Sequence, residues 1–88
     1  MRASKNYLKR VIAGETILIP SGAAAQQFNG LVTVNALGAF LWEALQNETD
    51  LETLVAKTTE EYEVDEATAK ADVEEFLADL RKLGALED

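Results

Sequence analysis

The side chains that most often carry catalysis at neutral pH are missing from this sequence. Its 88 residues include no histidine and no cysteine, which excludes the usual general base, a thiolate nucleophile and the commonest zinc ligands. Carboxylates such as Glu60, Glu61 and Glu63 fall at a predicted exposed helix end, and no glycine-rich phosphate loop is present. We therefore expect no enzyme, no metal site and no cofactor.

Charge is unevenly distributed along the chain. Four of the eight basic residues are Arg2, Lys5, Lys9 and Arg10, whereas fourteen of the sixteen acidic residues lie from Glu48 onward. The net charge of −8 produces a field that repels nucleic acid and anionic lipid and attracts basic peptides. No apolar run has membrane-spanning length, and no signal-peptide core is present. We expect a cytoplasmic protein that binds neither nucleic acid nor membrane.

The first half of the chain has the pattern of short strands. Strands are predicted over residues 7–12, 16–19 and 31–34, with a turn at 13–15 and Pro20 closing the second strand. The connection from Ser21 to Gln27 is compatible with a loop or one helical turn. Residues Phe28, Asn29 and Gly30 are predicted to turn the chain into the third strand.

The second half has a helical period. Asn35 is expected to cap a helix over about 36–45, and Thr49 to form a capping box with Glu52 at the start of a second helix. Asp65 is expected to cap the third helix, which Gly84 ends. The predicted fold is an α+β, winged-helix-like domain of residues 1–88, with three antiparallel strands before a three-helix bundle and a flexible arm at residues 1–6.

An ordered set of motifs gives the chain its resemblance to a known family. These motifs are Thr16-Ile-Leu-Ile-Pro20, Leu31-Val-Thr-Val-Asn35, Leu37-Gly-Ala-Phe-Leu-Trp42, Thr49-Asp-Leu-Glu-Thr-Leu54, Glu61-Tyr-Glu-Val-Asp65 and the ending from Val73 to Leu86. Over roughly residues 7–86 the sequence resembles the PqqD-like proteins, which assist pyrroloquinoline quinone biosynthesis and act as recognition elements for ribosomally made, post-translationally modified peptides. The order of these motifs along the chain is fairly specific.

The resemblance implies a non-catalytic module that captures the leader of a precursor peptide. In such proteins the leader adds as a strand to the third strand, packs against the third helix and is presented to a modifying enzyme, often a radical S-adenosylmethionine enzyme. Carried onto this chain, the peptide-binding residues are Leu31, Val32, Thr33, Val34, Asp72, Val73, Phe76, Asp79 and Leu80.

The residues themselves are compatible with this role but leave alternatives open. Phe76 and Leu80 are first of all expected in the core, and the acids Asp72, Glu75 and Asp79 are as compatible with a solvated helix face as with a leader that carries Lys or Arg. An open strand edge can instead pair with a second copy, as a homodimer or a strand swap. A winged-helix DNA-binding regulator and an adaptor subunit that binds no leader are the competing functions.

Overall fold

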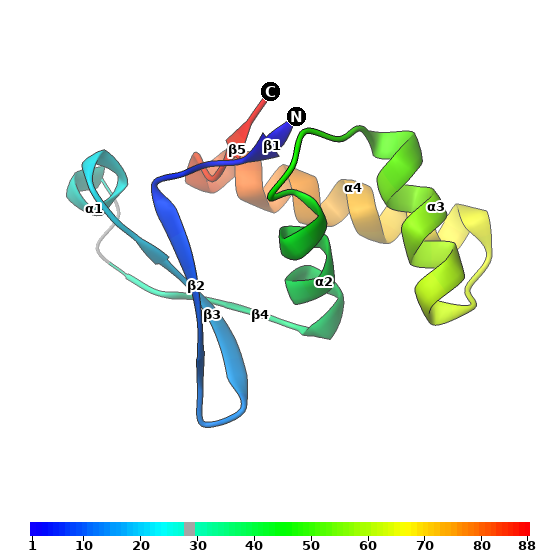
Figure 1. Cartoon of the computed structure of the whole chain (residues 1–88), viewed down its shortest axis with the longest axis horizontal. Helices are drawn as coiled ribbons and strands as arrows, with labels where there is room; N and C mark the ends of the chain where they lie inside the picture. Colours follow the sequence, from blue (N-terminus) through cyan, green and yellow to red (C-terminus); the bar gives the residue numbers. More distant parts are fainter. Residues whose placement is uncertain (28–29) are drawn as a thin grey trace.

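The computed structural model describes residues 1–27 and 30–88 and contains the predicted sheet (Figure 1). The strands β2 (Tyr7–Ile12), β3 (Glu15–Pro20) and β4 (Val32–Val34) form an antiparallel sheet in the order β2-β3-β4. The fold is α+β, as the change of hydrophobic period from strand to helix predicts. Both β2 and β4 are outer strands of this sheet.

A two-residue turn joins β2 to β3. Ala13 and Gly14 both have positive φ angles, 53° and 80°, as a type I′ hairpin turn requires. The register places Ile12 opposite Glu15, so the turn is as tight as a hairpin allows. The hairpin projects away from the helices (Figure 1).

The connection after β3 contains one short helix, α1 (Ala23–Gln27). The sequence of Ser21 to Gln27 is compatible with a loop or a helical turn, and the structure contains the helical turn. The turn predicted at Phe28 and Asn29 lies outside the described residues.

Three longer helices follow β4, as predicted. They are α2 (Ala36–Ala44), α3 (Leu51–Tyr62) and α4 (Glu66–Leu83). The Asn35 and Asp65 side chains cap α2 and α4, accepting hydrogen bonds from Gly38 N at 2.8 Å and Thr68 N at 2.7 Å. Gly84 ends α4 in the left-handed conformation, with φ 72°. These three local predictions are confirmed.

The capping box predicted at Thr49 is wrong. Asp50 is the N-cap of α3, and its side chain accepts a hydrogen bond from Thr53 N at 2.8 Å. The helix begins one residue late because the backbone of Thr49 is bonded to the N-terminal residue: Thr49 N–H donates to Met1 O at 2.9 Å, and the Met1 amine donates to Thr49 O at 3.0 Å. A contact across nearly fifty residues thus overrides a local signal.

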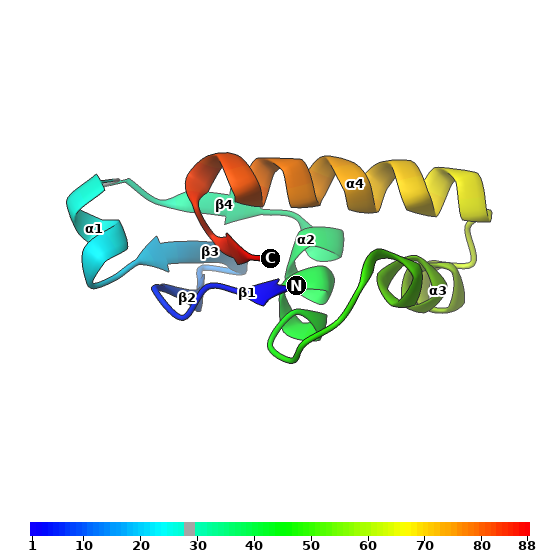
Figure 2. The ribbon, with the colours of Figure 1, turned by 90° about the horizontal axis from the view of Figure 1, so that it is seen from above.

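The flexible arm expected at residues 1–6 is also corrected. Strand β1 (Arg2–Ala3) pairs antiparallel with β5 (Leu86–Glu87), and Ala3 and Ser4 are buried. Ala3 N–H donates to Leu45 O, and Ser4 N–H donates to Ala85 O. The chain ends are therefore side by side (Figures 1 and 2), and the small apolar Ala3 lets the strand sit against the core.

The core lies between the inner face of the sheet and the three long helices. Its fully buried large side chains are Leu18 of β3, Leu41 and Leu45 at the end of α2, Leu54 and Thr58 of α3, and Val73 and Leu80 of α4. One hydrogen bond fastens the sheet to α4, because the hydroxyl of Tyr7 donates to Leu83 O at 2.7 Å. This packing holds β4 beside the C-terminal half of α4 (Figure 2).

Candidate peptide-binding groove

The register of the hairpin fixes which backbone groups of the sheet are paired. Tyr7 stands opposite Pro20, which has no N–H, and Tyr7 N–H donates instead to Ser4 O at 3.4 Å. This pair is therefore one of those that exchange no ladder hydrogen bonds. Because bonded and non-bonded pairs alternate in an antiparallel ladder, Leu8–Ile19 and Arg10–Ile17 are bonded pairs.

The same alternation continues across β3 to β4. Ile17 and Ile19 direct their N–H and C=O groups toward β2, so Thr16 and Leu18 direct theirs toward β4, where they face Val34 and Val32. Thr33, between these two valines, must then direct its backbone N–H and C=O to the other side. No strand of the described residues pairs with that side of β4. Thr33 therefore offers one donor and one acceptor to an incoming strand.

One hollow adjoins this open edge, and a second hollow continues it, so that the two make one groove, here called the β4–α4 groove. The first has a volume of about 160 Å³, and the second, toward the start of α2, about 300 Å³. Both are lined by Asn35, Phe76 and Asp79, so they are continuous around the half-buried Phe76 ring. The remaining lining residues are Val32, Thr33, Val34, Leu80 and Leu83 in the first and Leu37, Gly38, Asp72 and Glu75 in the second.

Most of the residues expected to bind peptide lie in this groove. Val32, Thr33, Val34, Asp72, Phe76, Asp79 and Leu80 line it. Val73 lines neither hollow, and its side chain is 0% exposed in the core. Leu31 precedes β4 and lines neither hollow, and its side chain is 62% exposed. The structure thus brings together seven of the nine residues on two elements.

Sequence reasoning left Asn35, Leu37, Gly38 and Leu83 out of the expected set. The sequence pattern could have indicated Leu83 as a groove residue, because it follows Leu80 by three residues on the apolar stripe of α4. Gly38 carried a weaker one, since glycine inside a helix lowers its stability unless something packs closely there. A β-carbon on Gly38 would lie 3.0 Å from both Phe76 Cε1 and Val34 Cβ.

The groove has an apolar floor and an acidic rim. Val32, Val34, Phe76 and Leu83 pack against the core and supply the apolar floor. Asp72, Glu75 and Asp79 are exposed beside them, and in the described part of the chain the ion pairs join other residues. The arrangement suits an extended peptide with apolar side chains on one face and basic ones near the rim.

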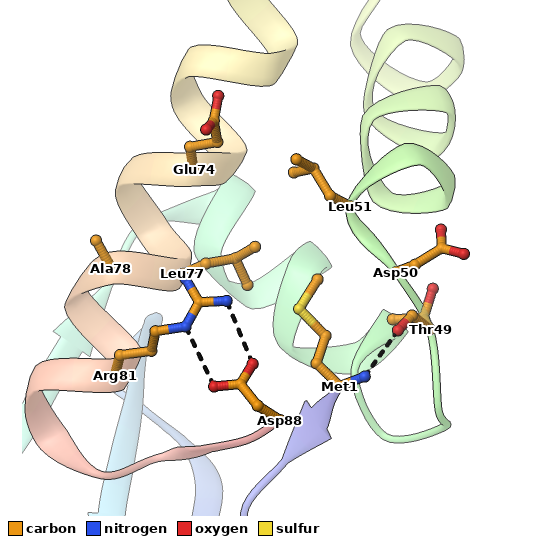
Figure 3. A pocket seen from close by; sticks show the side chains of 9 residues that line it. All are labelled: Met1, Thr49, Asp50, Leu51, Glu74, Leu77, Ala78, Arg81 and Asp88. Atoms are coloured by element: carbon orange, nitrogen blue, oxygen red, sulfur yellow. Dashed lines mark hydrogen bonds and ion pairs between the residues drawn. The ribbon is translucent and has the colours of Figure 1, made fainter.

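A larger hollow of about 620 Å³ lies on the other flank of α4, between the chain ends and α3 (Figure 3). Two of its charged side chains, Arg81 and Asp88, are paired with each other. Arg81 donates two hydrogen bonds of 3.3 Å to the Asp88 carboxylate, and this contact lowers the pKa of that carboxyl below its ordinary value of 3.8. The residues that line this hollow include no strand of the sheet, so it offers no edge for a peptide backbone.

The residues that the structure describes supply no group of three or more His, Cys, Asp and Glu side chains able to hold a metal ion. None of the helices formed by residues 1–27 and 30–88 combines the length and the apolar character needed to cross a bilayer.

The fold and the groove together define a winged-helix-like α+β domain in which the open edge of an outer strand lies beside the last helix. Residues 15–86 match the family model described as coenzyme PQQ synthesis protein D (PqqD), so the chain belongs to the PqqD family. This confirms the family resemblance that the sequence motifs indicate.

Comparison with solved structures finds a similar chain described as TbiB1 in complex with the TbiA(beta) leader peptide. The two chains share 26% sequence identity with a TM-score of 0.79, and the match covers 99% of this chain and 95% of that one. No curated protein matches the sequence.

Proposed function

We propose that this protein is a non-catalytic recognition domain for the leader of a ribosomally made precursor peptide. The leader adds as a strand along the open side of β4 and inserts side chains into the β4–α4 groove. The observation that carries the proposal is the position of Thr33, whose unpaired N–H and C=O border an apolar groove. Its support from known proteins is the leader-bound structure of TbiB1, which matches nearly the whole chain.

The groove is needed because the strand edge alone binds weakly. Each backbone hydrogen bond contributes about 0.5–1.5 kcal/mol net, and a three-residue edge forms few of them. Micromolar affinity requires about 8 kcal/mol. Burial of one large apolar side chain adds about 1.5–3 kcal/mol, so the leader must place at least two such side chains in the groove. The acidic rim adds a preference for Lys or Arg nearby.

The partner that receives the leader is a peptide-modifying enzyme, with a radical S-adenosylmethionine enzyme as the first candidate. We place the protein in the cytoplasm, where a newly synthesised precursor is available, and treat residues 1–88 as one recognition domain. The DNA-binding alternative gains no support, because α4 presents Asp72, Glu75 and Asp79 on the groove side, where phosphates would be repelled.

Thr33→Pro tests the proposal. Proline removes the N–H that faces the open side and is compatible with an outer strand. Binding of the leader of a candidate precursor peptide, measured by fluorescence anisotropy, should fall at least tenfold in Thr33→Pro and stay within about twofold in the control Thr33→Val, which keeps the N–H. Circular dichroism checks that both variants fold. A folded Thr33→Pro variant with unchanged affinity would place binding elsewhere.

A second experiment leaves the protein unchanged. A series of leader peptides, each N-methylated at one position so that successive residues are covered in turn, loses one donor per peptide. If the leader pairs with β4, methylation should weaken binding at every second residue only. Equal effects at all positions would contradict strand addition. A pull-down with leader alone against enzyme alone then separates leader capture from an adaptor role.

A further inference from the structure

The outermost strand on the other side of the sheet, β2, has an unusual surface. Of the five exposed large apolar side chains in the described residues, three lie on this six-residue strand: Leu8 is 44% exposed, Val11 64% and Ile12 57%. Lys9 and Arg10 lie between them. Strand β2 is therefore apolar and basic on a protein of net charge −8.

The free edge of β2 is also open to pairing. Because bonded and non-bonded pairs alternate along the β2–β3 ladder, the backbone N–H and C=O groups of Tyr7, Lys9 and Val11 are directed away from β3. Within the molecule, the Lys9 carbonyl accepts a hydrogen bond from Arg10 Nη1 at 3.3 Å. Natural outer strands that carry Lys and Arg resist pairing with an identical strand, because like charges then meet. Two β2 strands are therefore poor partners for each other.

These features match what the β4–α4 groove selects: an extended strand with apolar and basic side chains. The groove of the same molecule is out of reach, because β3 separates β2 from β4. We propose that β2 of one molecule docks in the β4–α4 groove of a second copy, so that the domain carries an internal mimic of the leader. This inference rests on the proposed function, since both partners use one groove.

The fit is best at the projecting end of the hairpin. Val11 shares a sheet face with Leu18, the face toward the helices, yet it remains exposed because the hairpin extends past them (Figure 1). With β2 running parallel to β4 of the second copy, Val11 lies on the same face as Val32 and Val34, so its side chain can enter the 160 Å³ hollow. Lys9, paired with Glu43 in its own molecule, lies on the same face and can reach the acidic rim.

The contact joins two different surfaces, so each added copy leaves one β2 and one groove free. Such head-to-tail contacts extend with concentration instead of stopping at a dimer. Leader peptide competes for the same groove and should therefore dissociate the oligomers. The consequence is a domain whose groove is protected when leader is scarce.

Sedimentation velocity tests the proposal with Val11→Asp and the matched control Ala56→Asp, which adds the same charge on an exposed position of α3. From about 10 μM to about 1 mM, the wild-type chain and the control should show sedimentation coefficients that rise with concentration, while Val11→Asp stays monomeric. A wild-type chain that remains monomeric, or a Val11→Asp variant that associates equally, would overturn the proposal.

A peptide probe separates this inference from the proposed function. A synthetic peptide of residues 7–13 should bind the monomeric Val11→Asp protein and lose at least tenfold in affinity when Thr33→Pro is added. Leader binding to Val11→Asp should equal that of the wild-type monomer. If leader binds but the chain never associates, only self-docking fails. If the chain associates and leader neither binds nor dissolves the oligomers, the proposed function fails.

Discussion

Gly38 of α2 and Phe76 of α4 approach so closely that a β-carbon on Gly38 would stand 3.0 Å from the Phe76 ring. The same β-carbon would stand 3.0 Å from Val34 Cβ, which β4 holds in place. Gly38 therefore sets the position of the ring that lines both hollows of the groove, and it joins the helix start to the strand edge.

Gly38→Ala is expected to impair peptide binding more than folding. Alanine favours the helix by about 1 kcal/mol, whereas overpacking costs about 1–3 kcal/mol, so the free energy of unfolding should fall by about 0–2 kcal/mol. The displaced Phe76 should lower leader affinity at least fivefold, measured by calorimetry. Adding Phe76→Leu, which relieves the crowding, should restore part of the affinity. Additive losses in the double variant would show that the two residues act independently.

Asp79 lines both hollows and should contribute to binding through charge. Asp79→Lys is expected to weaken leader binding about two- to fivefold at low salt and to reduce its salt dependence, because exposed charge pairs are modest and screened. Glu52→Lys makes the same charge change on α3, outside the groove, and serves as the control. Anisotropy titrations across a salt series measure both effects. Equal losses in the two variants would indicate a net-charge effect only.

Ala13 occupies a turn position that suits asparagine. Its φ of 53° costs an L-residue about 1–2 kcal/mol, while Asn-Gly is the preferred pair in this turn. Ala13→Asn should therefore raise the free energy of unfolding by about 0.5–1 kcal/mol, which thermal denaturation would record as a Tm increase of a few degrees. Ala13→Val, with a branched side chain, should lower the Tm. The same Tm for both variants would contradict the turn geometry.

The N-cap aspartates link stability to acid pH. The hydrogen bond from Thr68 N holds the pKa of Asp65 below its ordinary value of 3.8, and hydrogen bonds from Thr53 do the same for Asp50. A lowered pKa means that the stabilisation is present above about pH 3.8 and is lost as the pH falls through the folded-state pKa. Asp65→Asn keeps a capping side chain without the titration. Its unfolding free energy should match wild type at pH 7 and fall less between pH 4 and pH 2 in urea titrations. Parallel curves for the two proteins would exclude Asp65 as a contributor.

The sequence by itself determined the order and type of the main elements. Asn35, Asp65 and Gly84 act on backbone groups within a few residues, and hydrophobic periods report the face of a single strand or helix, so these features needed no tertiary information. The family resemblance, carried onto these elements, named nine binding residues, of which seven line the groove.

Only the tertiary structure decided which surfaces those elements leave open. Val73 and Phe76 share the apolar stripe of α4, yet Val73 is buried in the core, whereas Phe76 lies against Gly38 and lines the groove. The backbone hydrogen bond between Thr49 and Met1 shifts the start of α3, and β1 pairs with β5. Both contacts join residues that are far apart in the chain. The outward direction of Thr33 depends on strand register across the whole sheet. Such long-range pairings depend on the packing of the complete chain, which local propensity does not encode.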